Sequence, residues 1–308
     1  GSEMCIRDRY DYSQLTQIED LMDDVNAMTE AQAKIVNKDK DRTSLVKQYL
    51  EEVKALKDKE TYIKDSSNNQ LEIPYNKTAK FEKNNETIVM NGQLAIPFAE
   101  VMDPVLSNKN SFTIEVNVTP TGAPQYNMFA GKGDNAFALR SRGDSYADFH
   151  IYAGGSWRSI EFALPQELKN NWVNNEHQVV GQYDAENNKI ALFVDGKLLT
   201  QKEIGTTEGV APSNYDLTIG ACPSTGRTSE ADFTNVRVYN KALSEEEVAG
   251  QYSDEPAIKA DNKVVSLWVD FANIEHKDKE NISKVEINPS KVAIEVGKSE
   301  TLNLISDK

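Results

Sequence analysis

The most constraining feature of this sequence is an alternation of apolar and polar residues that recurs in short segments between residues 70 and 271. It is clearest at Phe112, Ile114, Val116 and Val118, whose intervening neighbours are polar. Successive side chains of a strand point to opposite faces, so each segment buries one face and leaves the other polar. Turn residues such as Asp195-Gly196 separate the segments. The pattern predicts a mainly β, antiparallel sandwich.

A helical period precedes these strands. The apolar residues of this region are Leu15, Ile18, Leu21, Met22, Val25 and Met28, followed by Leu45, Tyr49, Val53 and Leu56. Polar residues 37–41 separate the two groups, and Thr43 or Ser44 is expected to cap the second helix. We predict a helical hairpin over residues 11–65, in which Leu15, Ile18, Leu21 and Val25 pack on Leu45, Tyr49 and Val53. It serves either as a connector or as a partner-binding helix pair.

Composition limits the classes of partner. The formal net charge of −15 repels phosphate groups, which excludes nucleic acid and anionic membrane surfaces as favoured partners. No apolar run approaches the roughly 18 residues of a membrane span, so no membrane insertion is expected. Residues 1–10 resemble a tag or a cloning-derived leader, and setting them aside leaves Cys222 as the single cysteine. A single cysteine is too few for a disulfide framework or a thiolate zinc site.

Five segments resemble bacterial laminin-G-like domains in their order and spacing. They are FEKNNETIVM from Phe81, FTIEVNVTP from Phe112, HQVVGQYD from His177, IALFVDGK from Ile190 and NVRVYNKALSEEEV from Asn235. The resemblance covers about two thirds of the chain and implies a concanavalin-A-like antiparallel β-sandwich, or jelly roll, over residues 66–275. It also implies an extracellular, lectin-like module.

The resemblance raises the question of a structural calcium ion. Family members often hold one near an early Asp and a late acidic pair, where this chain has Glu82 and Thr234-Asn235. Calcium takes several oxygen ligands, including carboxylates. Glu82, Glu86 and Asp232 are the carboxylates in these segments, so retention and loss of the ion both remain open. No other cofactor is required.

Catalysis within this segment is not expected. Laminarinase-like glucanases of the same fold carry an E-x-D-x-x-E strand, because a nucleophile and an acid must project from one face. This sequence has no such strand. The run Glu245-Glu246-Glu247 is typical of a capped helix start, and the three histidines are too scattered to predict a metal triad.

A sugar-binding patch is predicted instead around Trp157, which lies in the polar hairpin Gly154-Gly-Ser-Trp-Arg158. Sugars stack their C–H faces on aromatic rings and take hydrogen bonds from planar polar groups. The predicted ligand-binding residues are Trp157, Tyr152, Arg158, Arg140 and His150. A tryptophan that merely covers a sheet edge is the structural alternative, and the loop around Tyr126 and Asp134 is the alternative site.

The C-terminal residues 276–308 complete the predicted organisation. ISKVEINPSKVAIEVGKSETLNL from Ile282 resembles the start of a bacterial group 2 immunoglobulin-like repeat, a spacer of exported multidomain proteins. The sequence therefore predicts a carbohydrate-binding accessory module of a larger secreted or cell-surface glycoside hydrolase, with a β-galactosidase as one candidate. Its partners would be a glycan or polysaccharide and the neighbouring domains of the parent chain. The alternative is a structural or adhesive spacer without sugar binding.

Overall fold

The computed structural model describes residues 15–38, 41–55, 59–74, 80–84, 87–91, 94–96, 102–133, 136–253, 255–278, 284–288 and 303–307. The chain divides into two compact units. One unit contains Thr61–Glu275, and the other contains the described parts of residues 10–60 and 276–308. Each unit is considered by itself below.

In the described part of the chain, the larger sheet of the sandwich has ten strands. They are β1 (Lys59–Asp65), β2 (Glu72–Pro74), β3 (Lys80–Asn84), β4 (Thr87–Asn91), β6 (Phe112–Pro120), β11 (His177–Asp184), β12 (Lys189–Val194), β13 (Lys197–Glu203), β17 (Ala231–Tyr239) and β18 (Val265–Asp278). Their order is β13-β12-β11-β6-β17-β18-β1-β2, and β4 joins β17 and carries β3. Each pairing of this sheet whose register the structure describes is antiparallel.

The smaller sheet has six strands. They are β5 (Leu94–Ile96), β7 (Asn127–Gly131), β8 (Phe137–Arg142), β9 (Tyr146–Ala153), β10 (Ser156–Ala163) and β14 (Leu217–Ile219), in the order β10-β9-β8-β7-β14-β5. Two short hairpins pair β15 (Ala221–Cys222) with β16 (Arg227–Thr228) and β19 (Lys284–Asn288) with β20 (Asn303–Asp307). The β19–β20 hairpin falls in the predicted immunoglobulin-like segment, whose fold stays a prediction.

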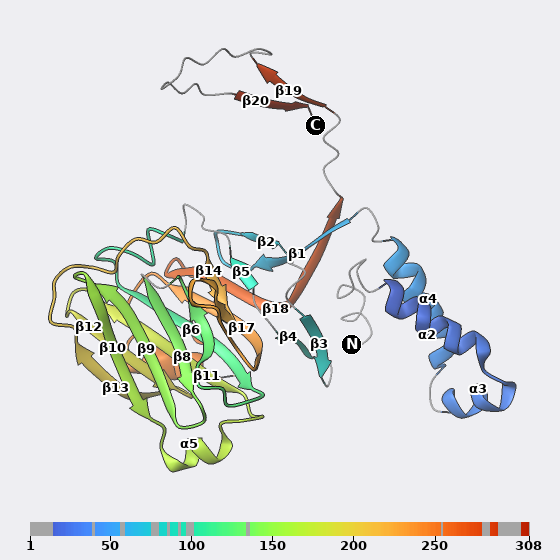
Figure 1. The fold of residues 1–308 in the computed structure, drawn as a ribbon, viewed down its shortest axis with the longest axis horizontal. Helices are drawn as coiled ribbons and strands as arrows, with labels where there is room; N and C mark the ends of the chain where they lie inside the picture. Colours follow the sequence, from blue (N-terminus) through green and yellow to red (C-terminus); the bar gives the residue numbers. More distant parts are fainter. Residues whose placement is uncertain are drawn as a thin grey trace. The chain divides into compact units, whose positions relative to one another are not determined.

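The two sheets face each other across one hydrophobic core (Figure 1). Phe112, Ile114 and Val116 of β6 are fully buried, as the alternation predicts. Gly181 of β11 allows the sheets to approach, because a Cβ there would lie 2.4 Å from the ring of Phe149 in β9. The predicted mainly β antiparallel sandwich is therefore confirmed.

The described residues before the sandwich form three helices, where the sequence predicted two: α2 (Leu15–Ala27), α3 (Glu30–Val36) and α4 (Arg42–Ala55). The additional break comes from Thr29, which caps α3 by accepting from the backbone of Gln32 while the Gln32 side chain accepts from Thr29. The predicted break at residues 37–41 is confirmed, but the cap of α4 is Asp41, whose carboxylate accepts from the backbone of Ser44. The last part of the predicted helical range, residues 59–65, forms β1.

The helices pack on each other through part of the predicted set: Leu15, Ile18 and Val53 belong to the shared cluster, and Leu21 and Val25 do not. Ile18 of α2 and Leu50 and Val53 of α4 are buried together, with Leu15 and Met22 against them. Leu21 is 48% exposed and contributes nothing to this cluster. The side chains of Leu45 and Tyr49 lie outside the described residues.

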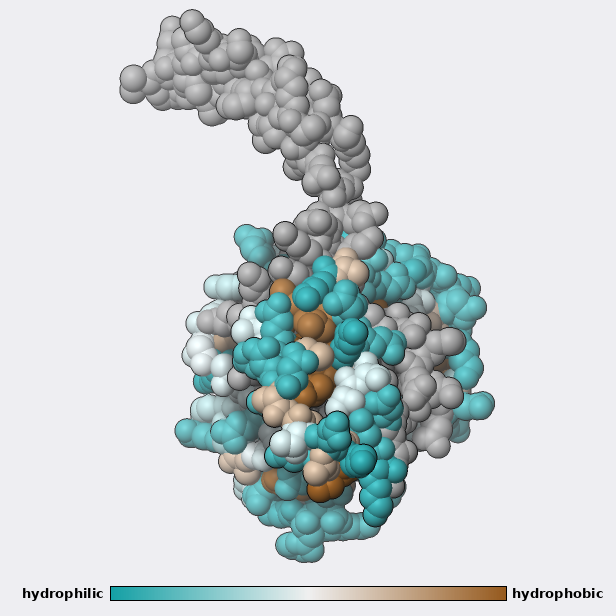
Figure 2. Space-filling model, turned by 90° about the vertical axis from the view of Figure 1, so that its right-hand side faces the viewer, coloured by the Kyte–Doolittle hydropathy of each residue, from teal (hydrophilic) through white to brown (hydrophobic). Residues whose placement is uncertain are grey.

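The described residues on the face shown in Figure 2 are predominantly polar. Hydrophilic side chains cover most of the coloured area of the face in Figure 2, and hydrophobic ones reach it in small patches. Among the described residues, no helix combines the length and the apolar composition that crossing a bilayer demands.

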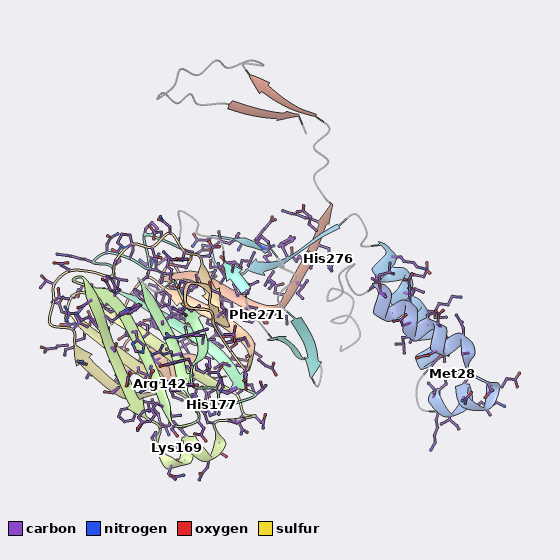
Figure 3. The ribbon with its side chains drawn as sticks, viewed as in Figure 1. Met28, Arg142, Lys169, His177, Phe271 and His276 are labelled. Carbon is purple, nitrogen blue, oxygen red and sulfur yellow. The ribbon has the colours of Figure 1, made fainter. Side chains whose placement is uncertain are left out.

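His177, at the start of β11, connects two turns of the sandwich. Its Nδ1 lies 2.9 Å from Asp195 Oδ2, and its Nε2 lies 3.1 Å from the carbonyl oxygen of Asn171 at the end of α5 (Gln166–Asn171), the helix that carries Lys169 (Figure 3). Both partners are pure acceptors, so both ring nitrogens carry protons. Burial opposes this charge, but the hydrogen bond and the charge of Asp195 outweigh it and raise the pKa of His177.

We expect His177 to make stability depend on pH. Its contribution is fully present below the unfolded-state pKa of 6.5 and is lost as the pH rises through the raised folded-state pKa. Urea unfolding should give wild type about 1.5–3 kcal/mol more stability than His177→Gln near pH 5, the range of hydrogen bonds to charged groups, and this difference should narrow by about pH 9. A difference that is independent of pH would contradict the double protonation.

Candidate functional site

Strands β8, β9 and β10 direct alternate side chains away from the core. Phe137, Phe149 and Ile160 face inward and belong to the hydrophobic core. The residues of opposite parity therefore share the outer face. On that face the strand register pairs His150 with Ala138 and Ser159, and it pairs Trp157 with Tyr152. The outer face thus brings together four of the five predicted ligand-binding residues: Arg140, His150, Tyr152 and Trp157.

Trp157 is an exposed ring of this face, as is Tyr146 at the other end of β9. It is 41% exposed, and its ring meets Tyr152 edge to face at 5.5 Å and His150 at 6.4 Å. Gly154 and Gly155 form the preceding turn with positive φ, which favours glycine. Tyr152 Oη donates to the Gly155 carbonyl over 2.9 Å, which ties the aromatic pair to the turn.

Arg158 does not join the patch. It is paired in register with Ile151, whose side chain faces the core, so Arg158 lies on the opposite face of β10 from the patch. Its Nε donates to the Ala153 carbonyl over 3.3 Å. It borders a smaller pocket of about 190 Å³ near the end of β13.

A pocket of about 430 Å³ opens beside Trp157. Its lining consists of Met128, Gly133, Ala138, Arg140, His150, Trp157, Cys222, Thr225 and Arg227. Met128, Ala138 and Cys222 are buried together and form an apolar part of the wall. Sequence reasoning missed the contribution of Cys222, Thr225 and Arg227, which lie on or beside the β15–β16 hairpin. The ring of Tyr126, which belongs to the alternative site, contacts the guanidinium groups of Arg140 and Arg227 at the rim of the pocket. Asp134, the other residue of that site, lies outside the described residues.

A buried charge network holds the arginines of this face. Asp148 is fully buried, and its Oδ2 lies 3.2 Å from Arg140 Nε, 3.0 Å from Arg142 Nε and 3.5 Å from His150 Nε2. Burial works to raise the pKa of Asp148, but His150 and the two arginines outweigh it and leave the pKa lowered. Asp148 therefore positions Arg140 from beneath and does not itself reach the pocket.

One group of side chains has metal-ligand character. Candidate ligand atoms of Asp148, His150 and Glu161 lie within 4.8 Å of one another. Arg142 pairs with both carboxylates, at 3.0 Å from Asp148 and 2.5 Å from Glu161. These ion pairs already neutralise the negative charge that a cation would require.

The predicted calcium ligands are only partly described. Glu82 lies on β3 and Asp232 on β17, with β4 between these strands. The side chain of Glu82 and all of Glu86 lie outside the described residues. Asp232 alone supplies fewer ligands than calcium takes, so the ion stays a prediction.

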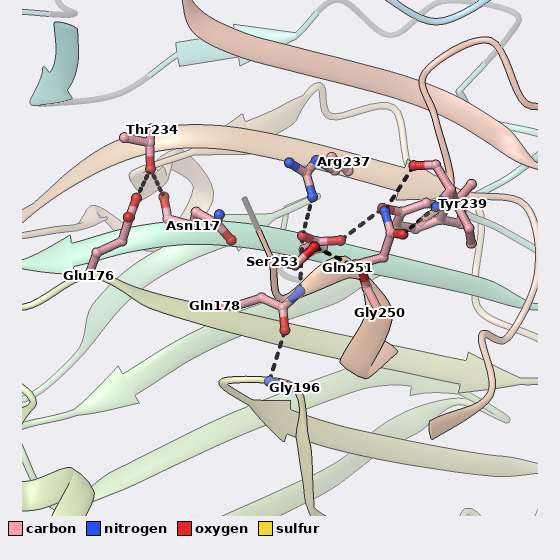
Figure 4. Close-up of polar contacts among 12 residues, drawn as sticks. Asn117, Glu176, Gln178, Gly196, Thr234, Arg237, Tyr239, Gly250, Gln251 and Ser253 are labelled. Carbon is pink, nitrogen blue, oxygen red and sulfur yellow. Dashed lines mark hydrogen bonds and ion pairs between the residues drawn. The ribbon is translucent and has the colours of Figure 1, made fainter. Parts of the chain in front are cut away.

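A second buried carboxylate lies on the outer face of the larger sheet. Glu115 of β6 is 1% exposed and accepts from Arg237 Nη1 at 2.7 Å, Tyr239 Oη at 2.8 Å and Gln178 Nε2 at 3.1 Å (Figure 4). Gln251 of α6 (Glu245–Gln251) closes the network through Tyr239 Oη. Burial raises the pKa of Glu115, and the charge of Arg237 opposes the rise. Enclosed in this way, Glu115 is a structural group.

Comparisons with solved structures give distant similarities. A candidate carbohydrate-binding protein from Bacteroides ovatus is 16% identical, with a TM-score of 0.44, over 70% of this chain and 58% of its own. The CBM40 domain of a Ruminococcus gnavus IT-sialidase, bound to α2,3-sialyllactose, is 14% identical with a TM-score of 0.39, over 47% of this chain and 83% of its own. A pentraxin from Limulus polyphemus is 12% identical with a TM-score of 0.41, over 72% of this chain and 96% of its own. The chain thus spans less than two thirds of the Bacteroides protein.

The family assignment rests on sequence. No curated protein matches the chain. Residues 94–249, about half of the chain, match the Laminin_G_3 family, described as the concanavalin A-like lectin/glucanases superfamily. This range extends from β5 to α6 and contains every strand of the candidate site. The chain therefore belongs to the concanavalin A-like lectin/glucanases superfamily.

Proposed function

We propose that this chain is a non-catalytic carbohydrate-binding module and that Trp157 is the platform on which a sugar ring stacks. The observation that carries the proposal is the exposed Trp157 ring beside a pocket that also presents Arg140 and His150. A pyranose places C–H groups against such a ring and its hydroxyls against directional polar groups.

The carboxylates of this face support binding over hydrolysis. A glycosidase needs one protonated carboxylic acid and one free carboxylate on either side of the scissile bond. Asp148 and Glu161 lie within 4.8 Å of each other, but both pair with Arg142. Asp148 is also fully buried with a lowered pKa, so it is ionised at neutral pH and is not available as an acid.

The wider role that we propose is that of an accessory module in a secreted or cell-surface bacterial glycoside hydrolase, with a β-galactosidase as a candidate parent. The support is the resemblance of residues 282–304 to an immunoglobulin-like spacer of exported proteins. Weak affinity is sufficient for such a module, because tethering raises the effective concentration of the linked active site at its polysaccharide.

A glycan array tests this function. Wild type should bind a reproducible set of glycans, and Trp157→Ala should lose them, since a stacked ring contributes on the order of 1 kcal/mol or more beyond its buried area. Tyr252→Ala is the matched control, because Tyr252 is 50% exposed but lies outside the pocket. Thermal melts should show that all three proteins are folded. If folded wild type binds no glycan on the array, the result would contradict the proposal and favour the spacer alternative.

A further inference from the structure

Among the described residues around the pocket, one arginine has no carboxylate partner. Arg140 and Arg142 are balanced by Asp148 and Glu161 in the ion pairs described above. Arg227 is half-buried on β16 and lines the pocket. In the part of the chain that the structure describes, no ion pair or hydrogen bond involves its guanidinium, and no carboxylate lines this pocket. Counting described residues alone, the site therefore carries one uncompensated positive charge, in a chain whose net charge is −15.

Tyr126 holds this charge in place. The guanidinium carbon of Arg227 lies 4.3 Å from the centroid of the Tyr126 ring, and that of Arg140 lies 4.7 Å from the same centroid. Each stack is favourable by itself, but the two cations lie close to the same ring and repel each other. The planar face of the Arg227 guanidinium can stack on Tyr126 while its N–H edge donates to a ligand. A bound anion that accepts from Arg227 would reduce this repulsion.

Carboxylates match this arrangement better than neutral hydroxyls. A guanidinium donates two parallel N–H groups to the two oxygens of a carboxylate, and this charge-assisted pair is about twice as strong as a neutral hydrogen bond. Trp157 and Arg227 line the same pocket of about 430 Å³. A sugar acid carries both required elements, an apolar ring face and a carboxylate, on one residue.

We propose that the pocket selects glycans that carry a sugar acid, with Arg227 as the residue that pairs with the carboxylate. This inference rests on the proposed sugar binding at Trp157 and adds the chemical class of the ligand. Arg140, which Asp148 keeps in position, adds positive charge beside the same Tyr126 ring.

The experiment compares acidic oligosaccharides with their own methyl esters by calorimetric titration. The probes are oligogalacturonides, glucuronic acid-terminated disaccharides and 3′-sialyllactose, and esterification removes the charge while keeping the ring and its hydroxyls. Wild type should bind at least one acid about tenfold or more tightly than the ester, as expected for a hydrogen bond to a charged group. Arg227→Gln should reduce binding of the acid to the level of the ester. Arg158→Gln, which removes an arginine outside this pocket, should leave both affinities unchanged.

The possible outcomes separate this inference from the proposed function. Equal binding of acid and ester, or unchanged selectivity in folded Arg227→Gln, would overturn the inference. Binding of neutral glycans that Trp157→Ala abolishes would then leave the carbohydrate-binding function standing. Selectivity for the acid that fails in Arg227→Gln but returns partly in Arg227→Lys would support a charge-based role, because lysine keeps the charge without the two-pronged geometry. No binding of any probe or array glycan would overturn both.

Discussion

Replacement of Glu115 by alanine is expected to lower the free energy of unfolding by about 3–5 kcal/mol, the range observed when one member of a buried ion pair is removed. Glu115 is 1% exposed and Arg237 is 6% exposed, so the substitution leaves a guanidinium charge without its carboxylate in a dry environment. Tyr239 and Gln178 also lose their acceptor. Arg237 retains its stacking on Trp268, at 4.0 Å, which does not compensate for the lost charge.

Urea unfolding of a double-mutant cycle measures this effect. Glu115→Ala, Arg237→Met and the double variant should show strong coupling, because the double variant contains no unpaired buried charge. Glu115→Gln keeps a hydrogen-bond acceptor, so its free energy of unfolding should lie between those of wild type and Glu115→Ala. A loss below about 1 kcal/mol for Glu115→Ala would show that water reaches the network and that it is not closed.

Replacement of Trp172 by alanine should cost a similar amount, about 3–5 kcal/mol, through loss of a fully buried aromatic side chain. Trp172 is fully buried, stacks on His177 at 4.7 Å with an angle of 20° between the rings, and contacts Phe129 at 6.4 Å. The stack also places a π face over a protonated imidazole, an arrangement that is itself stabilising. Removal of the indole would open a cavity between α5 and the core.

The same substitution at Trp157 is the matched control for this prediction. Trp157 is 41% exposed, and its replacement should change stability by less than about 1 kcal/mol while abolishing sugar binding. Comparison of the two tryptophan variants thus separates an effect on stability from an effect on sugar binding. Thermal and urea melts of both variants in parallel check this contrast, and a larger loss of stability at Trp157 than at Trp172 would contradict the assigned positions.

The sandwich was predictable from sequence because alternation encodes which face of a strand is buried. The same rule excludes Arg158 from the patch, since adjacent residues of a strand point to opposite faces. The break before α3 also had a signal, the Thr29 and Gln32 capping box. No sequence pattern indicated that Arg227 contributes to the pocket. Strands β15 and β16 comprise two residues each, so too few residues alternate to define a face.

The burial of Asp148 was likewise not predictable from sequence. An aspartate in an alternating strand is normally read as a solvent-facing residue. Its burial depends on Arg140 and Arg142 from the neighbouring strand, which the register of β8 and β9 places against it. Such pairing is a property of strand register and not of local sequence.

The most direct test of the proposed sugar site is an NMR titration of the three tryptophan indole N–H resonances with an oligosaccharide that binds on the array. Trp157 lies at the pocket, Trp172 is fully buried, and Trp268 is stacked by Arg237 on the larger sheet. The account predicts that saturating ligand shifts the Trp157 resonance and the backbone amides of β8–β10, and leaves Trp172 and Trp268 unchanged. A ligand that binds without moving the Trp157 indole would contradict it.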